Sequence, residues 1–229
     1  PPRHLPPGRT GTAAGGGVPQ WNCGCATCRA ARNGHPELQS TQASVAVSAD
    51  REHWFLVNAS PDLRQQITDN PVLHPKAGHL RQSPISGVIL TNGEVDAIAG
   101  LLSLREGTAF SLYAHERVLG ILNDNSIFNV LRSDLVPRRA ITLESPFALP
   151  LVDGSRSGLI VEAFPVPGKI ALLRDLDAFG LRQGGQGKHK EESDEALHRV
   201  VRLLRRVCSS HASGSSARMP WARTISPSK

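Results

Sequence analysis

Apolar residues occur along this chain in short runs that predict buried strands. Residues 43–49 (ASVAVSA) and 54–59 (WFLVNA) form two such runs, and the polar residues 50–52 between them predict a tight turn. Residues 87–90 (GVIL) are wholly apolar, which is typical of a strand that is buried on both faces. Further strands are predicted over 110–114, 140–143 and 159–166.

Helical patterns separate these strands. The sequence Ser60-Pro61-Asp62 predicts a helix start with Ser60 as the N-cap, and Pro71 ends that helix. Apolar residues at helical spacing predict two more helices, over 95–107 and 117–122. Strands that alternate with helices in this way favour a layered α/β fold.

The two ends of the chain differ from this body. Residues 1–20 are rich in Pro and Gly and show no helix or strand period. A charged segment near the other end carries an apolar stripe at helical spacing, and from Cys208 onward the composition predicts disorder. The stripe consists of Leu197, Val200, Val201, Leu204 and Val207. We therefore expect an irregular segment 1–20, an α/β domain 21–180, and a basic, partly helical tail 181–229.

The formal net charge of +6 lies in that tail, where ten Lys/Arg face four Asp/Glu. Residues 1–180 carry no net charge, so the folded part of the chain is not expected to bind nucleic acid through a basic face. No apolar run approaches the roughly 20 residues of a membrane helix, and no basic-then-apolar leader is evident. The sequence therefore predicts a cytoplasmic protein without a membrane span.

Three of the four cysteines, Cys23, Cys25 and Cys28, lie within six positions of one another. A disulfide framework would space its cysteines more evenly, whereas local thiolates can converge on one zinc ion. A structural zinc site needs a fourth ligand. His35 is near in sequence, while Cys208, His198 and His211 would have to fold back. The alternative interpretation is three free thiols on a loop.

A second candidate site follows the buried strand 87–90. The ends of strands that feed helices are where α/β folds place ligands. Asn92, Glu94 and Asp96 stand at alternate positions here and offer oxygen ligands to a hard metal ion. The alternative is that Glu94 and Asp96 are acids that stabilise a helix start.

Several long stretches of the sequence resemble those of a known family. They are AAGGGVPQWNCGCATCR, WFLVNASPDLRQQI, GVILTNGEVDAIAGLLSLRE, SIFNVL, VPRR and EAFPVPGK. In this order and spacing, from about Gly11 to Leu173, the chain resembles the coenzyme PQQ (pyrroloquinoline quinone) synthesis protein B family. The resemblance implies a metallo-β-lactamase-like αββα four-layer sandwich. The Pro-rich start and the loss of resemblance after Leu173 predict that this sandwich is incomplete at both ends.

The resemblance also implies a function and its residues. Family members typically read T-N-x-D-x-D-H in the second candidate site. On that pattern Asn92 and Asp96 are kept, Glu94 replaces an aspartate, and Ala97 replaces the histidine. The implied roles are transport of PQQ or its precursor to the periplasm, or metal-dependent hydroxylation of the tyrosine-derived precursor with iron.

If the chain is catalytic, Asp96 and Glu94 are the expected catalytic residues, and with Asn92 they form a weak metal site. The expected cofactors are a structural zinc at the cysteines and iron at that weak site. The expected partner is a small-molecule or peptide-derived PQQ precursor, and a homodimer is left open. The alternative function, favoured by Ala97, is a degenerate, non-catalytic domain stapled by zinc.

Overall fold

Two β-sheets packed face to face form the body of the protein. The computed structural model describes residues 15–167 and 197–205. In the first sheet the strand order is β1-β2-β3-β4-β5, where β1 pairs antiparallel with β2 and the other neighbours pair parallel. These strands are β1 Val45–Val47, β2 Trp54–Val57, β3 Ile85–Ile89, β4 Ser111–Ala114 and β5 Arg138–Ala140.

The second sheet is antiparallel, in the order β6-β7-β8. Its strands are β6 Phe147–Pro150, β7 Arg156–Pro167 and β8 Leu197–Arg205. Apolar side chains of both sheets form one core cluster, which comprises Phe55, Ile89, Tyr113, Ile141, Leu149, Leu159, Val161 and Ala163. This shared core holds the two sheets together, because side chains from the facing strands bury one another.

Helices cover the opposite face of the five-stranded sheet. They are α2 Leu63–Asp69, η2 Pro71–Leu73, α3 Val95–Ile98, η3 Ala99–Leu104, α4 Glu116–Asp124 and η4 Ser126–Val130. A larger core joins them to the sheet, and its fully buried members include Leu63, Val88, Leu101, Leu112 and Leu122. The layers within the described residues are therefore helices, sheet and sheet, and the predicted α/β class is confirmed.

Several predicted boundaries shift because tertiary contacts outweigh local signals. Ser60 is not the N-cap of α2, a position that Asp62 occupies. The Ser60 hydroxyl is buried and bonds instead to the Gln66 side chain (3.1 Å). The single helix predicted over 95–107 is a short α3 followed by the 3-10 helix η3. The strand predicted over 140–143 begins earlier, since β5 pairs with β4 from Arg138.

The prediction of a helical stripe in the tail is wrong over residues 197–205. This segment forms β8, which pairs antiparallel with β7 in register from Leu159↔Arg205 to Pro167↔Leu197. The twelve-residue β7 would otherwise expose a long row of backbone N–H and C=O groups along one edge. Edge pairing therefore overrides a helical pattern that contains two adjacent β-branched residues, Val200 and Val201. The predictions for residues 1–14, 168–196 and 206–229 lie outside the described residues.

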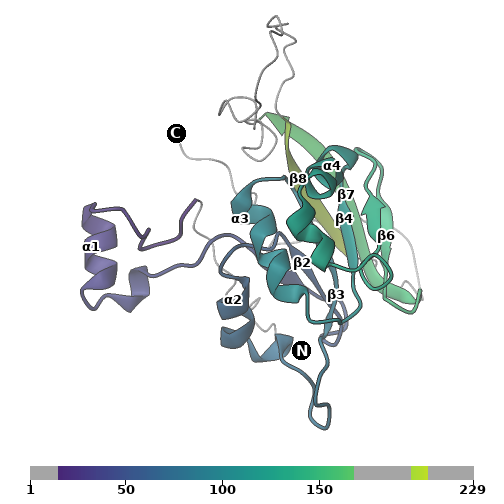
Figure 1. Cartoon of the computed structure of the whole chain (residues 1–229), viewed down its shortest axis with the longest axis horizontal. Coiled ribbons are helices and arrows are strands. Elements are labelled where there is room, and N and C mark those ends of the chain that lie inside the picture. Colours follow the sequence, from purple (N-terminus) through teal and green to yellow (C-terminus); the bar gives the residue numbers. More distant parts are fainter. Residues whose placement is uncertain (1–14, 168–196, 206–229) are drawn as a thin grey trace, which may run out of the picture.

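A small arm projects from the body and carries the cysteines (Figure 1). It contains α1 Ala26–Arg32 and η1 Pro36–Leu38, which pack on each other. At its base, Val18 and Ser40 exchange backbone hydrogen bonds of 2.7 and 2.8 Å. Helix α1 was not predicted, because the sequence interpretation treated the cysteine segment as a loop.

No helix in the parts of the chain that the structure describes is both long and apolar enough to cross a membrane.

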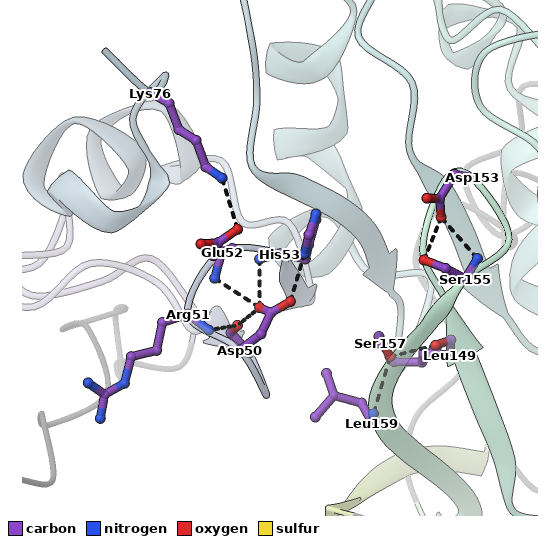
Figure 2. Close-up of polar contacts among 11 residues, drawn as sticks. Asp50, Arg51, Glu52, His53, Lys76, Leu149, Asp153, Ser155, Ser157 and Leu159 are labelled. Atoms are coloured by element: carbon purple, nitrogen blue, oxygen red, sulfur yellow. Dashed lines mark hydrogen bonds and ion pairs between the residues drawn. The ribbon is translucent and has the colours of Figure 1, made fainter. Parts of the chain in front are cut away.

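The predicted polar turn between β1 and β2 is confirmed, and Asp50 organises it (Figure 2). Its Oδ1 accepts hydrogen bonds from the Glu52 N–H (2.8 Å), the His53 N–H (2.9 Å) and the Ser48 hydroxyl (3.0 Å). Its Oδ2 lies 2.7 Å from His53 Nδ1. Desolvation is the largest single influence and raises the pKa of Asp50, but the hydrogen bonds from His53, Glu52 and Ser48 together hold that pKa well below its usual value.

This turn predicts an acid-dependent contribution to stability. A carboxyl with a depressed folded-state pKa stabilises the fold above its unfolded pKa of about 4, and that stabilisation is lost as pH falls through the folded pKa. Asp50 is 42% exposed, so solvent screening keeps the effect small. We expect Asp50→Asn to lower the free energy of unfolding by about 0.5–1 kcal/mol at pH 7. The difference should shrink below pH 4, as measured by urea unfolding across pH.

Asp69→Asn is the matched control for this prediction. Asp69 is an exposed carboxylate that accepts a side-chain hydrogen bond from Gln65 (2.7 Å), so the substitution accounts for the loss of one surface charge. A destabilisation by Asp50→Asn that stayed constant from pH 7 to pH 3 would contradict the assigned role of the Asp50 carboxylate.

Candidate metal centres

The structure brings the three predicted zinc ligands together. The Sγ atoms of Cys23, Cys25 and Cys28 all lie within 4.8 Å of one another. Cys28 is buried, Cys23 is partly buried and Cys25 is exposed, so the cluster opens to solvent on one side. Within residues 15–167 it is the one group of three Cys, His, Asp or Glu side chains that is close enough to share an ion.

The start of α1 produces this convergence. Cys25 is the N-cap of α1, in extended conformation, and its Sγ accepts a hydrogen bond from the Cys28 N–H (3.5 Å). Residues at an N-cap and three positions later face each other across the first turn, so this spacing places both thiols on one side. The Cys23 N–H bonds to the Gln20 carbonyl (3.1 Å), a turn that carries Cys23 back toward the helix.

The same hydrogen bonds change the acidity of the thiols. The Cys28 N–H, together with the Cys23 and Cys28 thiols, lowers the pKa of Cys25 from 9.0 to about 7. The backbone hydrogen bond at Gln20 lowers the pKa of Cys28, but burial and hydrogen bonds with the other two thiols raise it overall. As pH rises, Cys25 therefore reaches the anionic form before Cys28, and the thiolate is the form that binds metal.

A fourth zinc ligand is not identified among the described residues. Of the four candidates from the sequence, only His35 has a described side chain. His35 is exposed and its Nδ1 lies 2.9 Å from Glu37 Oε1, so it pairs with that carboxylate outside the thiol cluster. Cys208 and His211 lie outside the described residues, and for His198 only the backbone in β8 is described. The three converging thiols fit zinc, which favours sulfur ligands.

The loop after β3 is held in place by Asn58, at the end of β2. Asn58 Oδ1 accepts hydrogen bonds from both the N–H (2.9 Å) and the hydroxyl (3.0 Å) of Thr91. Asn58 adopts a left-handed conformation (φ 63°), which asparagine tolerates better than most residues. Its own backbone N–H bonds to Ile89 (2.8 Å), and its C=O accepts from the Ser44 hydroxyl (2.8 Å). The apolar pattern predicted Asn58 as part of a strand and did not indicate this role, although an asparagine directly after an apolar run is a signal for it.

The predicted metal residues of this loop are not gathered around one point in the way that the cysteines are. Asn92 Oδ1 accepts a hydrogen bond from the Glu94 N–H (2.9 Å), so this amide oxygen closes a local turn. Glu94 is the N-cap of α3, and Asp96 lies in its first turn. In residues 15–167 neither carboxylate joins a third Cys, His, Asp or Glu ligand. Ala97 is 4% exposed and has no ligand atom. The metal and catalytic roles of Asn92, Glu94 and Asp96 stay predictions.

Comparison with known proteins gives the family. The family model described as "Beta-lactamase superfamily domain" matches residues 53–189. The chain belongs to the beta-lactamase superfamily. Coenzyme PQQ synthesis protein B from Rhodopseudomonas palustris is 67% identical over 159 residues, which are 69% of this chain and 51% of the relative. The protein of the same name from Bradyrhizobium diazoefficiens is 65% identical over 177 residues, 77% of this chain and 57% of the relative.

A solved structure agrees with these sequence matches. Zn²⁺-bound PqqB from Methylobacterium extorquens superposes with a TM-score of 0.62 at 50% identity, over 68% of this chain and 54% of that chain. The predicted resemblance to the coenzyme PQQ synthesis protein B family is therefore confirmed, and so is the metallo-β-lactamase-like fold. This member of the superfamily spans about half the length of the curated relatives that it matches.

Proposed function

We propose that this chain serves in PQQ biosynthesis and that its cysteine arm holds a structural zinc ion. The identity of 67% to a coenzyme PQQ synthesis protein B supports the pathway. The observation that carries the zinc assignment is the convergence of three thiol groups within 4.8 Å. The M. extorquens relative was solved with zinc bound, which agrees with this assignment.

Zinc at this site would have a structural task. Bound to Cys23, Cys25 and Cys28, it would cross-link the turn before α1 to the first turn of the helix. Such a cross-link stabilises a small segment that has little core of its own. The arm is such a segment, since Cys28 and Ala31 are its buried residues in α1.

The described residues of the Thr91–Asp96 loop do not fit a redox iron centre. Iron sites of this kind combine imidazole with carboxylate ligands. Here the motif position of the imidazole holds Ala97, and the Asn92 oxygen is engaged by the Glu94 N–H. Hydroxylation of a tyrosine-derived precursor and transport of PQQ or its precursor remain the two family roles, with a small-molecule or peptide-derived precursor as the partner.

Ala97 favours a second candidate function, a zinc-stapled domain without catalysis. Both candidates are tested by Ala97→His, which restores a nitrogen donor beside Asp96. If the loop is a metal site that lacks one ligand, bound iron should rise from a trace to about one equivalent, because imidazole is a strong donor. In a strain that lacks its own coenzyme PQQ synthesis protein B, PQQ output should then rise roughly ten-fold or more over the unmodified chain.

Ala99→His is the matched control, because it adds the same side chain at a partly buried position outside the motif. Circular dichroism would show that both variants keep the fold. If Ala97→His folds but gains neither iron nor PQQ output, the non-catalytic candidate is the correct one.

A further inference from the structure

Arg32, the last residue of α1, reaches back to the segment that precedes the helix. Its Nη1 donates to the Cys23 carbonyl (2.7 Å), and its Nη2 donates to the carbonyls of Trp21 (3.2 Å) and Gln20. These acceptors lie 9 to 12 positions earlier in the chain. The guanidinium of Arg32 therefore ties the end of α1 to residues 20–23, which precede the helix.

This arrangement depends on the shape of the guanidinium group. Arginine is planar and presents several N–H donors in a fixed fork, so one side chain can hold several carbonyls in one relative position. A lysine ammonium carries a compact charge on a flexible stem and cannot impose the same geometry. Arg29 makes a simpler contact, from Nη1 to the Gly24 carbonyl (2.7 Å).

Two of the carbonyls that Arg32 binds belong to the turn that carries Cys23. One of them belongs to Cys23 itself, and the Gln20 carbonyl also accepts the Cys23 N–H. Cys25 and Cys28 are placed by the first turn of α1, but Cys23 lies before the helix and depends on the path of residues 20–24. Arg32 therefore contacts the part of the segment that carries Cys23, the one cysteine of the three that the first turn of α1 does not place.

The charge of Arg32 is available to this segment. Among the residues that the structure describes, no carboxylate lies within ion-pair distance of Arg32. A metal site with three thiolates gathers negative charge, and a nearby cation offsets the cost of gathering it.

We propose that Arg32 is the positioning residue of the cysteine site, which holds Cys23 against Cys25 and Cys28 so that the thiols are arranged before a metal binds. The proposal rests on the zinc site of the proposed function. Partners that orient the ligands of a metal site typically contribute about 10- to 100-fold in metal affinity.

The test compares Arg32→Gln, Arg32→Lys and Arg29→Gln in the full chain. Zinc affinity is measured by competition with a chromophoric chelator. Arg32→Gln should weaken zinc binding about 10- to 100-fold, and Arg32→Lys should restore only part of the loss. Arg29→Gln removes one carbonyl contact from the same helix and should weaken binding by less than about three-fold.

A second readout is independent of zinc. Arsenite binds closely spaced thiols, so its affinity for the metal-free chain reports their convergence. Arg32→Gln should weaken arsenite binding as well, and the cobalt-substituted variant should show a reduced thiolate-to-cobalt absorption band at equal metal concentration. Equal arsenite and zinc affinities in Arg32→Gln and the parent chain would overturn the role of Arg32. If the parent chain binds arsenite but no zinc, the zinc assignment fails, and the arsenite series still decides the role of Arg32.

Discussion

Among glycine-to-alanine substitutions in the described residues, Gly100→Ala should lower the stability of the protein the most. A Cβ at Gly100 would lie 2.0 Å from the Ser60 carbonyl oxygen and 2.8 Å from two backbone atoms of Ala59. The backbone of residues 59–60 cannot move away from Gly100 without a large cost in free energy, because the Gly100 N–H bonds to the Ala59 carbonyl (2.8 Å). We expect a loss of about 3 kcal/mol or more in the free energy of unfolding, measured by urea denaturation.

Gly120→Ala provides the control. Gly120 lies inside α4, and a Cβ there would meet no atom within 4 Å. Alanine in a helix interior is favoured over glycine by up to about 1 kcal/mol, so this variant should be slightly more stable than the parent. Similar unfolding free energies for the two variants would show that η3 does not approach the Ala59–Ser60 backbone as closely as the structure has it.

Cys28→Ser should abolish stable zinc binding. Cys28 is the buried member of the thiol cluster, and a serine hydroxyl is a far poorer zinc ligand than a thiolate. We expect zinc affinity to fall on the order of 100-fold or more, with bound zinc dropping from about one equivalent to a trace by atomic absorption. Proteolysis within residues 18–40 should accelerate, because the arm would lose its cross-link.

Thr27→Ser is the matched control for this variant, since Thr27 is exposed in the same turn of α1 and belongs to no group of ligands. It should retain one zinc and the parent rate of proteolysis. Retention of zinc by Cys28→Ser would rule out the three-thiol site.

The strands that the sequence predicted well are those whose burial requires a recognisable pattern of apolar residues. All five residues of β3 are buried, and the apolar run 87–90 reports that directly. The confirmed turn at Asp50 likewise depends on short-range hydrogen bonds. Strand β8 could not be predicted in the same way, because its conformation depends on pairing with β7, whose residues lie between 30 (Pro167↔Leu197) and 46 (Leu159↔Arg205) positions earlier in the chain.

The candidate sites differ in the same way, because only one of them is determined by contacts between residues close in the sequence. The cysteine spacing predicted a convergence that the first turn of α1 produces locally. The Asn92, Glu94 and Asp96 pattern did not specify where the side chains point, since the Asn92 oxygen is used within its own turn. Arg32 was missed because its partners are backbone carbonyls, which leave no mark on the residue types of the loop.

The base of the cysteine arm has a consequence for how such a protein can be altered. Val18 and Ser40 are paired, so the two ends of the segment 18–40 lie side by side where the arm meets the body. A segment whose two ends lie side by side can be shortened, lengthened or replaced without moving the strands that follow it. We therefore expect changes in length or sequence between residues 19 and 39 to leave the strands of the sandwich in place.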